Sequence, residues 1–265
     1  PATLLLMEKL EAAGLSAFVG KVNMDRNCPE NLCEAGAGKA KAVTEQWLEK
    51  CVNFRHVKPI LTPRFIPTCS DEMMSMLSEL QKKYRIPVQS HLSENVGEIA
   101  WVGALCPETS FYGEAYEKYG FFGGECPAIM AHCVHSGEAE IELMQKNGVF
   151  IAHCPESNAN LSSGIAPVRT YLDRGLSVGL GTDVAAGTSL SMFHAMAEAV
   201  RCSKLRWRLV DASLAPLKVS EVFYMATKGG GRFFGNVGSF ENGYEFDAVV
   251  LEDSRARTAR MLTLA

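Results

Sequence analysis

The chain has 265 residues, of which 47% are apolar and 21% charged, and its formal net charge is −4. This composition is typical of a globular protein and excludes a disordered chain. It gives no electrostatic reason to expect a nucleic acid or an anionic membrane as partner. No apolar run approaches the roughly 18 residues that a membrane helix needs. The length fits one α/β barrel of roughly 250 residues.

Strand-like apolar runs alternate with helical patterns along the chain. Strands are predicted over 17–23, 57–64, 86–91, 128–133, 149–154 and 176–183. Helices are predicted over 3–13, 40–51, 70–80, 110–120, 138–147, 168–175, 189–205 and 219–228. The alternation predicts a parallel sheet with crossover helices, and both a doubly wound sheet and a (β/α) barrel are compatible with it.

Two glycine-containing segments near the end of the chain depart from this alternation. Gly229, Gly230 and Gly231 follow a predicted helix without the Lys-Ser/Thr pair of a phosphate-binding loop, so we expect a turn that ends the helix. Residues 238–253 indicate a turn followed by an extended segment, which we assign to a small separate sheet.

Nine cysteines occur at irregular spacing, and none forms a C-x-x-C pair. Such a pattern disfavours both a disulfide scaffold and a cysteine-rich zinc site. It favours reduced and mostly buried thiols, and therefore an intracellular, cytoplasmic protein.

Polar side chains that can carry chemistry gather at the carboxyl ends of the predicted strands. They are Arg64, His91 with Glu94, His132, His153 and Asp183. Parallel α/β sheets and barrels place their active sites at this edge. Taken alone, each residue also has a structural interpretation, for example a hydrogen-bonded core histidine or a carboxylate in the first turn of a helix. The joint arrangement favours a functional site.

Histidine and aspartate on neighbouring strands are ligands that zinc accepts, and a catalytic zinc keeps one position open for water. Glu94 follows His91 by three residues, so its carboxylate could reach that water without binding the metal. A metal that lowers the pKa of water, together with a carboxylate that moves the proton, is typical of a hydrolytic enzyme.

Four segments resemble the amidohydrolase superfamily, in the order that the family has them. They are SHLSEN (90–95), MAHC (130–133), AHCPESN (152–158) and GLGTD (179–183). Within the superfamily, TPRF (62–65) and GTDVAAG (181–187) are most similar to the members that deaminate guanine. The resemblance extends from about residue 17 to 253.

The resemblance implies a (β/α)8 TIM-type barrel, one zinc ion per subunit, and hydrolysis of guanine to xanthine and ammonia in purine breakdown. By matched position, His91 and Asp183 would bind the metal. Glu94 would move a proton from the attacking water to the purine ring, and His132 would orient the water and the oxyanion. Asp183 would also help to move a proton to the leaving ammonia, while His153 would be a scaffold residue.

The substrate would be a small purine, and the resemblance also suggests a homodimer. Arg64 and Phe65 would hold the purine, because an Arg donor suits a ring carbonyl and an aromatic face suits a flat base. His91, Glu94 and Asp183 would complete the substrate-binding set.

The chain departs from the superfamily in one respect, because it lacks the His-x-His metal pair of the first strand. We therefore expect a fragment that holds strands three to eight, with residues 1–237 forming a partial barrel and 238–265 returning to a small β-sandwich domain. Two alternatives stay open. One is a related deaminase that acts on another aminopurine, a pterin or a triazine, and the other is a non-catalytic scaffold without a complete metal site.

Overall fold

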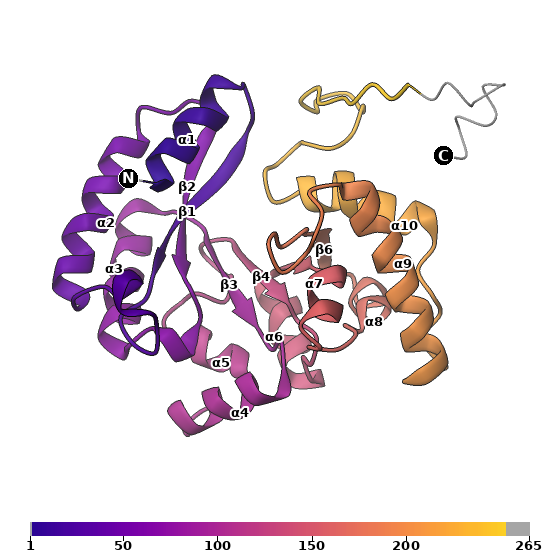
Figure 1. The fold of residues 1–265 in the computed structure, drawn as a ribbon, viewed down its shortest axis with the longest axis horizontal. Helices are drawn as coiled ribbons and strands as arrows, with labels where there is room; N and C mark the ends of the chain where they lie inside the picture. The colour runs from indigo at the N-terminus through magenta and orange to yellow at the C-terminus, as the bar shows by residue number, and fades with distance from the viewer. Residues whose placement is uncertain (1, 253–265) are drawn as a thin grey trace.

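Six parallel strands form one sheet, and helices lie along its outer side (Figure 1). The computed structural model describes residues 2–252. The strands are β1 (Ala17–Asn23), β2 (Val57–Pro63), β3 (Val88–Leu92), β4 (Ala128–His132), β5 (Phe150–His153) and β6 (Ser177–Leu180). All six predicted strands are confirmed, with bounds shifted by at most three residues.

The α-helices are α1 (Ala2–Ala12), α2 (Ala37–Cys51), α3 (Asp71–Tyr84), α4 (Val96–Leu105), α5 (Tyr112–Glu117), α6 (Glu138–Asn147), α7 (Pro155–Asn160), α8 (Val168–Asp173), α9 (Met192–Leu209) and α10 (Val219–Tyr224). Short helical turns are η1 (Glu30–Leu32), η2 (Ile66–Thr68) and η3 (Met225–Gly229). Of these elements, α4, α7 and the short turns η1 and η2 were not predicted.

The strand order decides between the two α/β architectures. The strands pair in chain order from β1 to β6, and all described pairings are parallel. A doubly wound sheet would reverse its order at a switch point, whereas a barrel adds each strand on the same side. The described residues therefore form part of a barrel-type sheet that is open between β1 and β6.

The register aligns the carboxyl ends of the strands. Leu92 pairs with His132 between β3 and β4, and His153 pairs with Leu180 between β5 and β6. The loops after these strands therefore begin at the same edge of the sheet, where the predicted chemical residues lie.

Helix α3 shows how the sequence fixes a covering helix. The Ser70 Oγ accepts a hydrogen bond from the Met73 N–H at 3.1 Å, which caps the first turn. Its buried side includes Met73, Leu77 and Leu80, spaced to face the sheet. The main core between sheet and helices contains, among others, Leu61, Val88, Leu92, Tyr112, Tyr116, Met130, Ile151 and Val178.

A second, smaller core joins the first two helices to the first two strands. It consists of Met7, Val19, Trp47, Leu48, Cys51 and Val57. Burial of this apolar area anchors α1 and α2 on β1 and β2.

The three glycines near the end of the chain do not form the helix-ending turn that we expected. A π-helical stretch ends at Gly229, and the chain stays helical through Gly230 and Gly231. A Cβ on Gly229 would lie 2.9 Å from the Val178 carbonyl oxygen, and one on Gly179 would lie 2.9 Å from the Gly230 Cα. The glycines therefore let the helix backbone pack directly on β6.

Residues 239–252 form turns and irregular segments without a strand. The remainder of the predicted β-sandwich segment, 253–265, lies outside the described residues. The assignment of 238–265 to a second domain thus stays a prediction.

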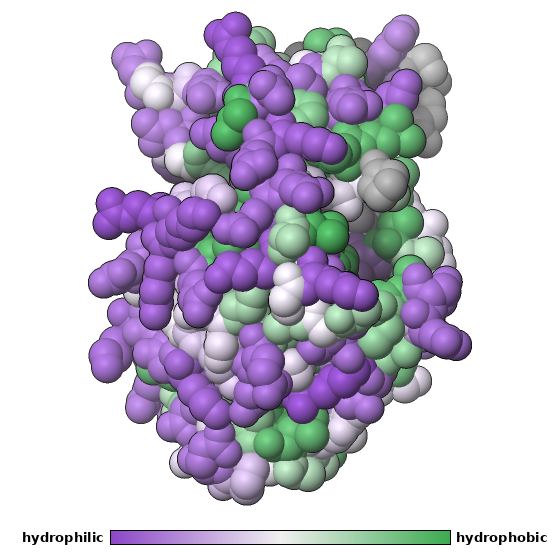
Figure 2. Space-filling model, turned by 90° about the vertical axis from the view of Figure 1, so that its left-hand side faces the viewer, coloured by the Kyte–Doolittle hydropathy of each residue, from purple (hydrophilic) through white to green (hydrophobic). Residues whose placement is uncertain are grey.

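The face that includes α2 and α3 is mostly hydrophilic, with hydrophobic side chains in small separate groups (Figure 2). Within residues 2–252, no helix combines the length and apolarity needed to cross a membrane. All nine cysteines are free thiols, six of them buried.

Candidate active site

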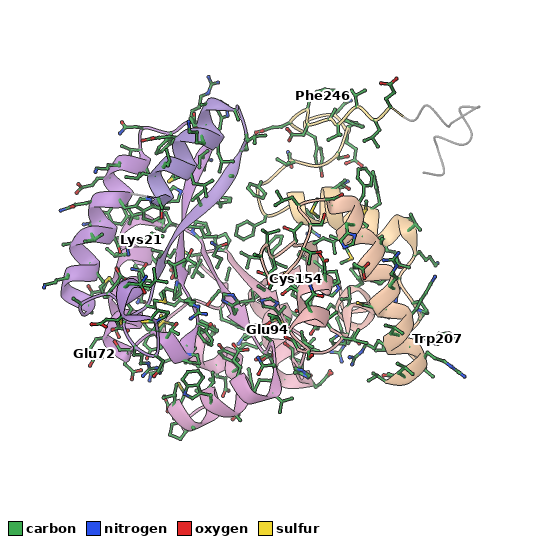
Figure 3. The ribbon with its side chains drawn as sticks, in the orientation of Figure 1. Lys21, Glu72, Glu94, Cys154, Trp207 and Phe246 are labelled. Atoms are coloured by element: carbon green, nitrogen blue, oxygen red, sulfur yellow. The ribbon has the colours of Figure 1, made fainter. Side chains whose placement is uncertain are left out.

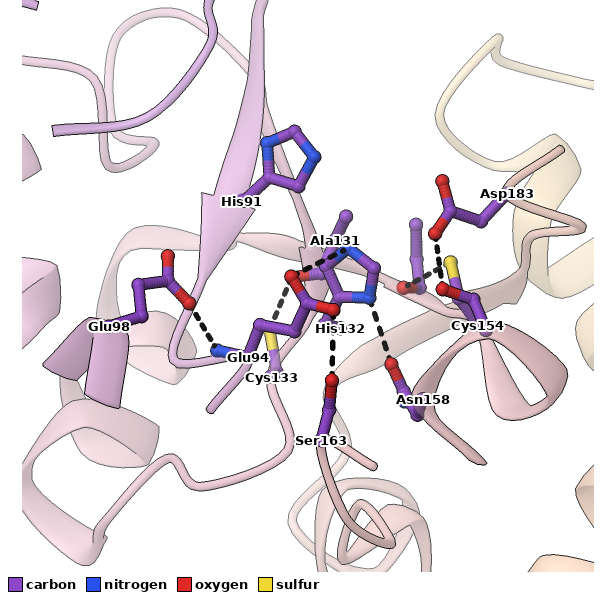
Figure 4. Close-up of polar contacts among 12 residues, drawn as sticks. His91, Glu94, Glu98, Ala131, His132, Cys133, Cys154, Asn158, Ser163 and Asp183 are labelled. Carbon is purple, nitrogen blue, oxygen red and sulfur yellow. Dashed lines mark hydrogen bonds and ion pairs between the residues drawn. The ribbon is translucent and has the colours of Figure 1, made fainter. Parts of the chain in front are cut away.

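The predicted chemical residues meet at the carboxyl edge of the sheet. Glu94, just after β3, lies near the middle of the molecule, whereas Glu72 and Trp207 lie at its periphery (Figure 3). Around Glu94 are His91 from the end of β3, His132 from the end of β4 and Asp183 from the loop after β6 (Figure 4).

His91 is held by a backbone carbonyl of the neighbouring strand end. Its Nδ1 lies 2.6 Å from the Arg64 carbonyl oxygen. A carbonyl oxygen only accepts, so Nδ1 carries the proton and Nε2 keeps its lone pair. Burial and, next, the nearby His132 lower the pKa of His91, which favours this neutral form. A histidine fixed in this way is typical of a metal ligand.

His132 is buried between three polar neighbours. Its Nδ1 donates to the Asn158 Oδ1 at 2.9 Å, and its Nε2 lies 3.8 Å from the Glu94 Oε2. Its ring stacks on that of His91, with centroids 5.4 Å apart. The backbone at His132 has φ +73°, a left-handed conformation that is rare for a non-glycine residue and common at functional sites.

The Glu94 carboxylate has one partner on each side. Its Oε1 accepts a hydrogen bond from the Ser163 hydroxyl at 3.0 Å, and its Oε2 faces His132. The Glu94 backbone N–H donates to the Glu98 Oε2 at 3.0 Å (Figure 4). The carboxylate therefore lies next to the His132 imidazole, at a separation longer than a direct hydrogen bond.

Asp183 lies across the site from these groups, in the loop that follows β6. Its Oδ2 accepts a hydrogen bond from the Ser157 hydroxyl at 2.5 Å, and its carbonyl oxygen accepts the Gly187 N–H at 2.7 Å. Its φ of +47° is also left-handed. Oδ1 is not used in these bonds, so one carboxylate oxygen is available to a cation.

Arg64 and Phe65 form a separate, more open part of the site. The exposed Arg64 guanidinium lies over the Phe65 ring, 5.1 Å from its centroid. The same ring meets His91 edge-on at 6.1 Å and Trp101 of α4 edge-on at 6.3 Å. This arrangement offers an aromatic surface and a fork of N–H donors beside His91.

His153 is close to the site but is fully enclosed. Burial, followed by the nearby His132, lowers its pKa to about 3, so the ring is neutral. Its buried Nδ1 has no hydrogen-bond partner in the described part of the chain. Within residues 2–252, no hydrogen bond or ion pair joins its side chain to Glu94 or Asp183, and its role as a scaffold residue stays a prediction.

His91 and Asp183 are the two residues expected to bind a metal ion. Among the described residues, no group of three or more His, Cys, Asp or Glu side chains is arranged to hold a metal ion. His91 and Asp183 nevertheless have the features of ligands, because each is fixed by a partner and keeps one donor atom free. These two residues fit a metal as part of a larger ligand set.

Several residues that build the site were not singled out from the sequence. They are Glu98, Trp101, Ser157, Asn158 and Ser163. Ser157 and Asn158 belong to the AHCPESN segment, which carried a resemblance but no role. Glu98 and Trp101 lie on α4, which has glycines at 97 and 103 and buries only Glu98 and Val102, so it lacks a helical apolar stripe.

Comparison with known proteins places this geometry in a family. The model described as the amidohydrolase family matches residues 1–263. The chain belongs to the amidohydrolase family. Its open sheet is thus the incomplete form of the TIM-type barrel of its structural neighbours.

Guanine deaminases are among the similar proteins. A probable guanine deaminase of Schizosaccharomyces pombe is 37% identical over 259 residues, which is 95% of this chain and 49% of that protein. The crystal structure of guanine deaminase from C. acetobutylicum with bound guanine in the active site is 51% identical with a TM-score of 0.89, covering 92% of this chain and 58% of that one. An adenosine deaminase from Xanthomonas campestris with bound zinc is 25% identical with a TM-score of 0.80, covering 91% and 54%.

The chain spans about half the length of the curated relatives it matches. The activity of the whole protein is therefore inferred from the site.

Proposed function

We propose that the intact protein hydrolyses guanine to xanthine and ammonia. The observation that carries this proposal is the convergence of Glu94, His132 and a tautomer-fixed His91 at the strand ends, beside the Arg64–Phe65 surface. The 51% identity to a guanine deaminase crystallised with guanine supports the choice of substrate.

The purine would lie against the Phe65 ring, with the Arg64 guanidinium donating to its ring carbonyl. A flat base gains stacking energy on an aromatic face, and the guanidinium offers two parallel N–H donors. His91 and Trp101 form T-shaped pairs with the Phe65 ring and so help to fix its orientation. The substrate would then extend from Phe65 toward Glu94.

The reaction replaces the amino group by the oxygen of water, so both protons of the water leave its oxygen. One proton goes to a ring nitrogen and the other goes to the amino group, which departs as ammonia. Glu94 would accept the proton from the attacking water and pass it to a ring nitrogen. His132 would orient the water and stabilise the oxyanion from the other side of Glu94. Asp183 would help to move a proton to the departing ammonia.

His91 and Asp183 would contribute to holding a zinc ion. Bound there, zinc would lower the pKa of water toward about 7. A catalytic zinc usually has three protein ligands, so it would need at least one donor besides these two residues. A zinc-bound neighbour at 25% identity supports the metal.

The decisive experiment is ammonia release by the purified full-length protein from guanine, adenine, a pterin and an aminotriazine. Guanine should give the highest kcat/KM, and chelation of the metal should remove the activity. If ammonia were released from another ring but not from guanine, guanine would be the wrong substrate. If the zinc-loaded protein released ammonia from none of the four compounds, the proposal of a deaminase would be wrong. The cytoplasmic location and the homodimer stay predictions that fractionation and sedimentation can test.

A further inference from the structure

Two buried carboxylates lie behind the turn that carries Glu94. Glu98 is 7% exposed and Glu140 is 1% exposed. Burying a carboxylate is costly unless hydrogen bonds or a cation compensate. Among residues 2–252, their hydrogen bonds come from neutral donors rather than from Lys or Arg. Burial accordingly raises the pKa of both groups. Because burial of a carboxylate is costly, the groups that these two carboxylates hold in place are identified by their hydrogen bonds.

Glu98 connects the backbone of Glu94 to helix α5. Its Oε2 accepts the Glu94 N–H at 3.0 Å, and its Oε1 accepts the Tyr112 hydroxyl at 2.9 Å (Figure 4 shows the first bond). The bond to the Glu94 N–H is like a capping box, because Asn95 caps α4 by accepting the Glu98 N–H at 2.9 Å while the Glu98 side chain reaches back to the residue before Asn95. The bond to the Tyr112 hydroxyl lies outside that motif and joins the turn to α5.

Glu140 of α6 makes the matching connection one residue earlier. Its Oε2 accepts the Ser93 hydroxyl at 2.8 Å, and its Oε1 accepts the Gly113 N–H of α5 at 2.7 Å. Ser93 has φ +47°, a left-handed conformation that costs energy in a non-glycine residue unless its surroundings hold it. Its carbonyl oxygen also accepts the N–H groups of Val134 and His135, at 3.1 and 3.0 Å.

We propose that Glu98 and Glu140 are positioning residues, which fasten the Ser93–Glu94 turn to helix α5 and thereby aim the Glu94 carboxylate at His132 and the substrate. Each carboxylate uses one oxygen for the turn and the other for α5. The catalytic consequence rests on the proposed deaminase function, whereas the mechanical fastening does not.

The first test separates positioning from binding in the full-length protein. Glu98→Ala and Glu140→Ala should each lower kcat for guanine by about 100-fold, because a misplacement of about 1 Å costs that much. The KM for guanine and the zinc content should stay unchanged, because neither residue is placed against the purine or the metal.

Conservative variants and a surface control complete this test. In Glu98→Gln and Glu140→Gln, the amide oxygen can still accept the backbone N–H, and the amide NH2 can donate to the hydroxyl oxygen. These variants should therefore recover most of the lost kcat. Tyr112→Phe removes one donor of Glu98 and should lower kcat by only about 10-fold. Glu142→Ala, an exposed glutamate on α6, should leave kcat and KM unchanged.

The second test needs no substrate. Amide hydrogen exchange of the segment around Glu94 should accelerate at least 10-fold in Glu98→Ala and stay at the wild-type rate in Glu98→Gln and Glu142→Ala. Unchanged exchange in Glu98→Ala, or an equal loss of kcat in the Ala and Gln variants, would overturn the proposal. Faster exchange in a protein that does not deaminate guanine would instead support the fastening and reject the proposed function.

Discussion

The two sides of the candidate site differ in how firmly their side chains are held. On the proton-moving side, Glu94, His132 and Asp183 each have a hydrogen-bond partner from α7 or the segment just after it. On the substrate side, Arg64 is exposed and contacts Phe65 through its guanidinium face. The first side is preorganised without substrate, whereas the second leaves its hydrogen-bond donors free for a ligand.

This difference makes a prediction about kinetics. Substitutions on the proton-moving side should lower kcat with little change in KM, because they act on the transition state. Substitutions on the substrate side should raise KM more than they lower kcat, because they remove binding that ground state and transition state share.

The largest effect is expected for Glu94→Gln. Glutamine keeps the size of the side chain and can still accept from Ser163, but it cannot take a proton from water. Turnover of guanine should fall by at least about 1,000-fold, while zinc content and KM stay close to those of the wild type. Ammonia release and metal analysis of the full-length protein measure both.

Glu72→Gln serves as the control for that substitution, because Glu72 is an exposed glutamate at the start of α3. It should keep wild-type turnover. If Glu94→Gln also kept near-normal activity, the proton-transfer role of Glu94 would be wrong.

Asn158→Ala should have the next largest effect on kcat. The Asn158 Oδ1 holds the Nδ1 proton of the buried His132, and its loss frees the imidazole to change tautomer and orientation. Removal of such a supporting hydrogen bond typically costs 10- to 100-fold in activity. We expect a loss of that size in kcat without a change in KM.

Asn160→Ala is a suitable comparison, since Asn160 ends the same helix and its side chain donates to the Ala186 carbonyl oxygen at the exposed surface. Its kcat should fall by less than 3-fold. If the KM of Asn158→Ala rose by the same factor as its kcat fell, the proposed difference between the proton-moving side and the substrate side would be wrong.

Much of the fold could be predicted from local sequence patterns. The strand segments are apolar runs bounded by turn residues, and helix α6 ends where Gly148 adopts φ +67°. Helix α7 was not predicted, although Pro155 at its first position is a typical helix start. Gly229–Gly231 were misread because close packing on β6 is a tertiary demand that no local pattern shows.

The site was predictable to the extent that its residues end a strand. His91 and His132 do so, Asp183 follows in the loop after β6, and a shared sheet edge then brings the three together. Glu98 and Ser163 support Glu94 from elements that follow other loops, and Ser163 lies 69 residues away in the chain. Such long-range partners depend on how the loops fold back, which residue spacing does not encode.

Arg64→Ala tests the substrate side of the comparison. Loss of a charged donor to the purine carbonyl should raise the KM for guanine by about 10- to 100-fold, with a smaller change in kcat and no loss of zinc. Arg64→Lys should recover only part of the affinity, because an ammonium cannot form the planar pair of donors. An unchanged KM in both variants would remove Arg64 from the substrate-binding set.

The last prediction concerns the free energy of unfolding. It tests whether the protein is stabilised by keeping His153, which is buried near His132, uncharged. Burial lowers the pKa of His153 from 6.5 to about 3, so between these values the unfolded chain binds a proton that the folded protein does not. The resulting stability is complete above pH 6.5 and is lost as the pH falls toward 3. At pH 5 this loss amounts to about 2 kcal/mol relative to pH 8. His153→Gln should therefore shrink the difference in urea stability between pH 8 and pH 5 by that amount, whereas His56→Gln, at an exposed position, should leave it unchanged.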